Sequence, residues 1–232
     1  MIRVVTLLLL FSTLSVFGIA QVYTPSGYIT DSYGNAIKAN RVSDGISGTQ
    51  YLNEVWCHGQ IVTPEGKILE VEKMKFNLLL NRIEFDVSGQ PMELKIPTQK
   101  FSINTPTPEG SIDKRFFVSG FPRIGDQNEK SFYEVLFDGN SKVLKYHKIR
   151  VSEYAEAGSM TRTKHYNTVE LLYVYHSGKN TIIPISKKRA DILAAFDDRK
   201  TDVEKFMASK KMKRISESDA MAVCQFYNEL TN

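Results

Sequence analysis

The sequence predicts an α+β fold that is mainly β, with an antiparallel meander sheet followed by two or three C-terminal helices. Between about residues 50 and 185, apolar and polar residues alternate with a period of two, interrupted by turn residues. After Pro184 the apolar spacing becomes helical, and the composition of 42% hydrophobic and 24% charged residues is that of a globular protein. Each alternating strand has one apolar face, so we expect a curved sheet, a half-barrel or a sandwich that buries it.

The amino terminus has the layout of a secretory signal peptide over residues 1–20. Arg3 supplies a positive start, an apolar run follows, and the small residues Gly18 and Ala20 occupy the −3 and −1 positions before Gln21. The apolar run is short for crossing a bilayer. We therefore expect cleavage after Ala20 and an exported mature chain; the alternative is an uncleaved N-terminal anchor.

Four hairpins account for most of the predicted β domain, which covers residues 21–185. Each turn contains Gly together with Pro or Asn, residue types that are favoured in tight turns. The hairpins join residues 60–62 to 68–71, 82–87 to 92–96, 133–137 to 143–146, and 169–175 to 181–183. The pattern predicts seven to nine strands over 50–185. Residues 21–49 and 153–164 have neither period and are predicted to be loop or irregular edge.

The remaining segment, 186–232, is predicted to be helical. Ser186 can cap a helix over 187–207, which the polar run 197–200 can divide in two. The residues 216–219 form a capping box that opens a last helix. We expect one apolar stripe from these helices to dock on the sheet, with the basic residues outward; the stripe consists of Ile192, Phe196, Val203, Phe206, Val223, Tyr227 and Leu230.

Charge is unevenly distributed along the chain. After removal of Arg3 with the signal, 29 basic and 26 acidic residues remain, which is too small an excess to indicate nucleic acid as a partner. Residues 187–214 nevertheless hold ten basic and five acidic residues. The basic run is either the solvated side of the helices or a contact site for an anionic envelope surface, such as lipid head groups or acidic glycans; its candidate residues are Lys187, Lys188, Arg189, Lys210, Lys211, Lys213 and Arg214.

The two cysteines, Cys57 and Cys224, are both placed on apolar faces by their local patterns. One interpretation is two small buried hydrophobic side chains. The other is a disulfide, possible in an oxidising compartment, that ties the last helix to the sheet. In either case we expect both residues to be buried and the last helix to pack near the strand that contains Trp56.

Strong catalytic signatures are missing from the sequence. There is no Gly-x-Ser-x-Gly elbow, phosphate-binding glycine loop or His-Glu-x-x-His motif, and no two of the four histidines have the spacing of a metal site. We therefore predict no cofactor and no metal. A hydrolytic site assembled from distant residues, such as His165 and His176 with nearby carboxylates, is kept as a less favoured alternative. Tyrosines around 133–175 are interpreted as strand formers rather than as the lining of an aromatic pocket.

Three short motifs resemble uncharacterised exported β-rich proteins of Bacteroidota. They are GTQYLNEVW at 48–56, KFNLLLNRIEF at 75–85 and the ending FYNEL at 226–230. The resemblance implies a location in a bacterial envelope. It carries no known activity, so no site residue is transferred from it.

Together these observations predict an exported bacterial envelope protein with a non-enzymatic, ligand- or partner-binding β domain. The expected partner is an envelope protein, a lipid or a glycan, and the expected location is periplasmic, outer-membrane-associated or extracellular. A narrower alternative is a carrier of apolar ligands such as lipids, and a purely structural role in an envelope assembly is close to the main hypothesis. No transmembrane helix is predicted after signal cleavage.

Overall fold

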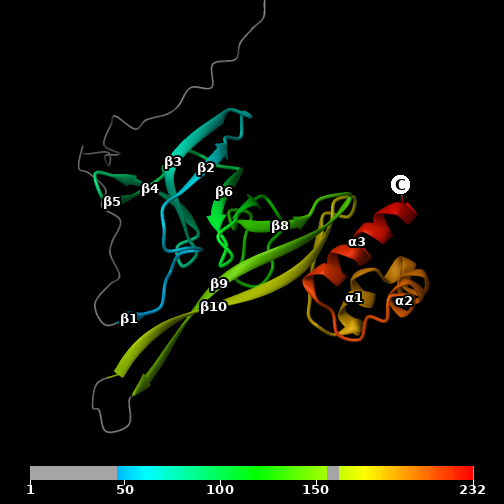
Figure 1. Ribbon diagram of the computed structural model, residues 1–232. Helices are drawn as coiled ribbons and strands as arrows, with labels where there is room; N and C mark the ends of the chain where they lie inside the picture. Colours follow the sequence, from blue (N-terminus) through cyan, green and yellow to red (C-terminus); the bar gives the residue numbers. More distant parts are fainter. Residues whose placement is uncertain (1–45, 156–161, 232) are drawn as a thin grey trace, which may run out of the picture.

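The computed structural model describes residues 46–155 and 162–231, and Figure 1 shows their arrangement. The predicted signal peptide and its cleavage site lie outside these residues. The strands are β1 (Ile46–Ser47), β2 (Cys57–Val62), β3 (Ile68–Asn77), β4 (Arg82–Val87), β5 (Gln90–Glu93), β6 (Lys100–Pro106), β7 (Ile112–Val118), β8 (Tyr133–Phe137), β9 (Ser141–Ala155), β10 (Arg162–His176) and β11 (Thr181–Ile185). The helices are α1 (Arg189–Ala195), the short 3-10 helix η1 (Asp197–Arg199), α2 (Lys200–Ser209) and α3 (Glu217–Thr231).

The predicted fold class is confirmed: the protein is mainly β, with an open, predominantly antiparallel sheet followed by helices. The strand order is β1-β10-β9-β8-β7-β6-β2-β3-β4-β5, and β11 also pairs with β10. The order departs from a simple meander where β6 pairs with β2 rather than with β5. The connection between β5 and β6, residues 94–99, therefore crosses back over the end of the sheet.

The four predicted hairpins are present, but the strand count was too low. The hairpin of β6 and β7 was missed, although Phe101 and Ile103 alternate there with polar residues. The prediction of loop for 153–164 was also wrong at its ends, because β9 and β10 continue to Ala155 and from Arg162. Backbone pairing between the two strands continues to these ends, which lack the apolar alternation on which the sequence prediction rested.

The β9–β10 hairpin forms the long axis of the molecule, as Figure 1 shows. The sheet curls so that residues from β2, β3, β4, β6 and β7 share one core with Ile149 of β9 and Tyr166 of β10. Four phenylalanine rings fill this core in edge and stacked contacts, with centroids 4.7–6.0 Å apart; they are Phe76, Phe101, Phe117 and Phe132.

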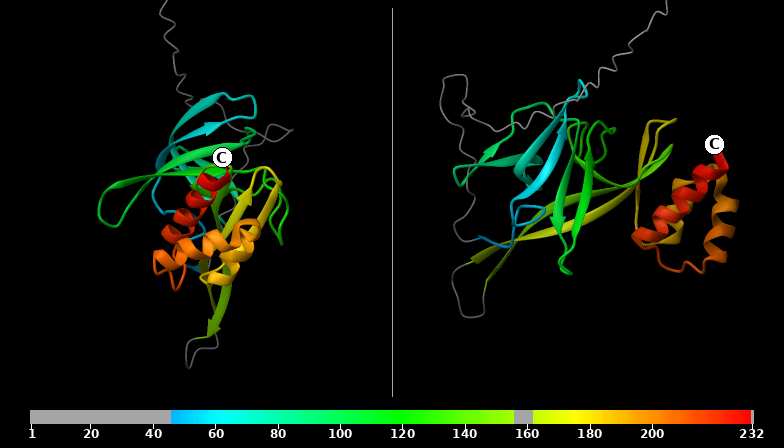
Figure 2. Two further views of the ribbon diagram at one scale, coloured as in Figure 1. Left: turned by 90° about the vertical axis from the view of Figure 1, so that its right-hand side faces the viewer. Right: turned by 45° about the horizontal axis from the view of Figure 1, so that its top comes forward.

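The helices cover the other end of this hairpin, as both views in Figure 2 show. The predicted break falls at η1, and the capping box is formed, since the Ser216 hydroxyl accepts from the Asp219 N–H (3.1 Å) while the Asp219 carboxylate accepts from the Ser216 N–H (2.9 Å). Most of the predicted stripe is buried, but Leu230 is 39% exposed and Phe206 only partly buried. No helix of the described residues is long and apolar enough to span a membrane.

Candidate functional site

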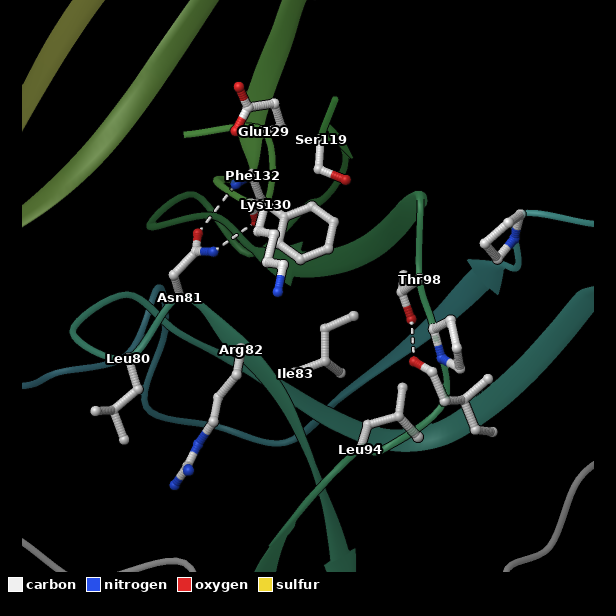
Figure 3. Close-up of a pocket in the computed structure, with 13 residues that line it drawn as sticks. Leu80, Asn81, Arg82, Ile83, Leu94, Thr98, Ser119, Glu129, Lys130 and Phe132 are labelled. Carbon is white, nitrogen blue, oxygen red and sulfur yellow. Dashed lines mark hydrogen bonds between the residues drawn. The ribbon is translucent and has the colours of Figure 1, made fainter. Parts of the chain in front are cut away.

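An open cleft of about 600 Å³ lies beside the β3–β4 turn, and Figure 3 shows its lining. One wall is the crossing connection after β5 and another is the segment that precedes β8. Ligand sites in proteins typically have volumes of this order. The lining residues are Pro64, Leu80, Asn81, Arg82, Ile83, Leu94, Ile96, Pro97, Thr98, Ser119, Glu129, Lys130 and Phe132.

Asn81 holds two walls of the cleft together. Its backbone has a φ of 49°, in the left-handed region that asparagine tolerates better than most residues. Its side chain accepts a hydrogen bond from the N–H of Phe132 (3.0 Å) and donates one to the carbonyl of Lys130 (2.9 Å), as the dashed lines in Figure 3 show. The β3–β4 turn is thereby fixed to a segment about fifty residues later.

The remaining wall, the connection after β5 at residues 94–99, is also fixed by hydrogen bonds. The Ser119 hydroxyl and N–H both donate to the carbonyl of Gln99 (3.1 and 3.0 Å), and the Thr98 hydroxyl donates to the carbonyl of Ile96 (3.0 Å). The N–H of Gly120 donates to the carbonyl of Glu129 (2.7 Å). These hydrogen bonds leave the walls little freedom, which reduces the entropy that a ligand would have to overcome.

The floor of the cleft is apolar and its rim is charged. Phe132 and the buried Ile83 form the floor with Leu94, while the exposed Lys130 forms no ion pair within 4 Å among the described residues. The Arg82 guanidinium is instead held by Glu84 (3.0 Å) and by a second carboxylate of β5. Lys130 is thus the cation of the rim that is available to a ligand.

The lining contains neither histidine nor cysteine. Its polar groups are hydroxyl, amide, carboxylate and cationic side chains, which can all form hydrogen bonds to a ligand. Sequence reasoning missed this site because its walls come from five segments between residues 64 and 132. The usable signal was Asn81 itself, an asparagine at the tip of a tight turn.

The basic residues singled out in the sequence are brought together. The N–H of Ile215 donates to the carbonyl of Lys187 (3.1 Å), and the Arg189 guanidinium donates to the carbonyl of Met212 (3.2 Å). The two basic segments, 187–189 at the start of α1 and 210–214 between α2 and α3, therefore lie side by side. Six of the side chains are exposed and Arg189 is partly buried.

The two cysteines are both buried, as predicted, but they do not pair. Cys57 lies in the phenylalanine core and Cys224 in the core beneath the helices, and both are free thiols. The disulfide alternative is therefore wrong, and so is the docking of the last helix near Trp56. Helix α3 packs on β8 and β9 instead, because those strands present apolar residues beyond the curled part of the sheet.

We expect neither cysteine of the folded protein to react with a maleimide at pH 8 within minutes. Burial raises the pKa of Cys224 to about 12 and raises that of Cys57, so little thiolate forms. Mass spectrometry after labelling should show two adducts in denaturant without a reducing agent and none under native conditions. Unfolded, unreduced protein that takes up no label would demonstrate a disulfide.

The histidines of the hydrolase alternative lie far apart. His165 and His176 lie on one strand, about 35 Å from each other at 3.3 Å per residue. His176 is buried; its Nε2 donates to the carbonyl of Ala195 (2.8 Å), and its Nδ1 lies 2.7 Å from the Ser141 hydroxyl. Asn228 of α3 bonds both backbone groups of Ser141. Asn228 and His176 thereby connect the helical segment to the start of β9, next to the β8–β9 turn.

A largely buried ionic cluster links strands β7, β8 and β9. Arg115 of β7 donates two hydrogen bonds to Glu134 of β8 (2.7 and 2.5 Å), and His147 of β9 lies 2.7 Å from the same carboxylate. Burial alone would raise the pKa of Glu134, but the hydrogen bonds from Arg115 and His147 lower it to about 2. Lys145 extends the cluster to Glu217 at the start of α3 (2.8 Å).

The described residues contain no group of three histidine, cysteine, aspartate or glutamate side chains that could hold a metal ion. Fold and cleft together define a mainly β protein with an open cleft beside its β3–β4 turn and a helical end. No protein-family model matches the chain, and comparison with curated proteins and with solved structures gives no match.

Proposed function

We propose that this protein is a non-enzymatic binding module of a bacterial cell envelope, and that its cleft holds a ligand or a segment of a partner. The observation that carries the proposal is the cleft, with its fixed walls, apolar floor and available cation at Lys130. The predicted signal peptide at residues 1–20 and the resemblance to exported Bacteroidota proteins support the proposed envelope location.

The other functions considered have less support. A carrier of apolar ligands needs an open apolar cavity, whereas four phenylalanine rings pack together inside the curled sheet. A hydrolase needs converging acid–base groups, whereas His165 and His176 lie at opposite ends of β10. A mainly structural role in an envelope assembly would use the same cleft to hold a neighbouring protein.

Native mass spectrometry of protein recovered from its own cells tests the proposal. The wild type should carry a bound molecule or partner. The mass of its polypeptide should be that of a chain that begins at Gln21. The variant Lys130→Glu with Leu80→Asp changes two exposed residues of the cleft and should lower occupancy at least tenfold. The matched control, Lys114→Glu with Ile112→Asp, makes the same changes on exposed positions of β7 and should retain it.

Two outcomes would contradict the proposal. Equal loss of the bound species in both double variants would mean that the cleft is not the binding site. An intact Met1 on protein that remains in the cytosol would contradict export.

A further inference from the structure

We propose that the basic end of the helical segment binds the phosphate groups of an anionic membrane surface. The basic end consists of Lys187, Lys188, Arg189, Lys210, Lys211, Lys213 and Arg214. The proposal concerns a second surface and does not depend on the cleft, whose lining residues lie between positions 64 and 132 and include none of the helical segment. Figures 1 and 2 show the helices at one end of the molecule, away from β2–β5.

The fold holds the basic end in place. The segment before α1 and the segment before α3 are joined by the hydrogen bonds from Ile215 to Lys187 and from Arg189 to Met212. Met212 and Ile215 alternate with the basic residues and are buried in the helical core. These apolar side chains anchor the segment before α3, and the two hydrogen bonds hold the segment before α1 against it. Six of the seven basic side chains are exposed to solvent.

The charges of the basic end are not neutralised locally. Among the described residues, none of its seven side chains lies within 4 Å of a carboxylate. Three carboxylates of the helical segment are engaged elsewhere: Glu217 pairs with Lys145, Asp219 caps α3, and Asp198 accepts from Tyr227. A basic surface kept free in this way attracts anions over several ångströms.

The composition of the basic end favours a membrane over other polyanions. Five of its seven residues are lysines, which act as point charges and suit a mobile array of head-group phosphates better than a defined bidentate site. Single-stranded nucleic acid would need exposed aromatic rings for stacking. The rings next to the basic end, Phe206 and Phe226, stack on each other instead (4.3 Å).

Vesicle sedimentation tests the proposal with processed protein and two lipid compositions. We expect binding to vesicles that contain phosphatidylglycerol and not to pure phosphatidylcholine, with binding lost as salt is added. The variant in which Lys187, Lys188, Lys210 and Lys213 become Gln should bind at least tenfold more weakly, since each charge contributes about fivefold near an anionic surface. It spares Arg189, which bonds Met212, and Lys211, whose φ is 54°.

The matched control replaces four other exposed lysines with Gln, at positions Lys67, Lys73, Lys100 and Lys164, and should bind like the wild type. The cleft variant Lys130→Glu with Leu80→Asp should also keep vesicle binding. Failure of the proposed cleft function can therefore be distinguished from failure of membrane binding. Equal losses in both lysine sets, or binding to both lipids alike, would overturn the proposal. Displacement by millimolar inorganic phosphate, or binding only to an acidic glycan or an oligonucleotide, would overturn it as well.

Discussion

Replacing Arg115 with methionine is expected to lower the free energy of unfolding by about 3–5 kcal/mol at pH 7, because it leaves the buried carboxylate of Glu134 without its main partner. The change removes a bidentate pair that links β7 to β8. Urea denaturation, followed by far-UV circular dichroism, gives the free energy directly.

The same pair makes stability depend on pH. The pKa of Glu134 falls from 4.5 to about 2 on folding, so the carboxylate contributes stability that is fully present above pH 4.5. That contribution, on the order of 3 kcal/mol, is lost as the pH falls from 4.5 towards 2. The acid-dependent loss should be smaller in Arg115→Met, since the lowered pKa depends on the guanidinium.

A double variant distinguishes two causes of the lost stability, the uncompensated charge of Glu134 and the lost packing around Arg115. Arg115→Met combined with Glu134→Leu removes both charges and should recover a large part of the lost stability. If the double variant is as unstable as the single one, the cost arises from lost packing around the aliphatic part of Arg115 rather than from an uncompensated charge.

Replacing Phe196 with alanine is expected to cost about 3–5 kcal/mol, because the ring is fully buried where α1 meets η1. It contacts the rings of His176 and Tyr227, at centroid distances of 5.4 and 4.6 Å. Leu230→Ala is the matched control on the same predicted stripe. Since Leu230 is 39% exposed, its loss should cost well under about 1 kcal/mol in the same denaturation experiment.

Truncation after Ser186 extends this prediction to the whole segment. The fragment loses twelve of the fifteen buried residues of the helical core and exposes Val143, Val174 and Ile185. We expect it to aggregate or to unfold without a cooperative transition, as measured by scanning calorimetry. A soluble fragment with a sharp transition would show that the β part folds without the helices.

The sequence predicted those features that depend on residues close together in the chain. The alternation at 82–87 predicted the strand β4, and its Ser-Gly turn predicted the hairpin to β5. The predicted wet face was wrong at Glu84, which is buried together with Ile83 and Phe85. The serine and aspartate of 216–219 predicted the start of α3 to within a residue. Strand alternation, turn conformation and helix capping act over two to four positions, so their signals are local.

Other features were decided only by the tertiary structure. The pairing of β6 with β2 sets which segments line the cleft, and the bonds from Asn81 to Lys130 and Phe132 join positions about fifty residues apart. The two cysteines lie in different cores because α3, which contains Cys224, docks on β8 and β9. The sequence by itself determined a mainly β chain with a helical, basic C-terminal segment; the cleft, the ionic cluster and the joined basic segments depend on strand register and helix docking, which no local pattern specifies.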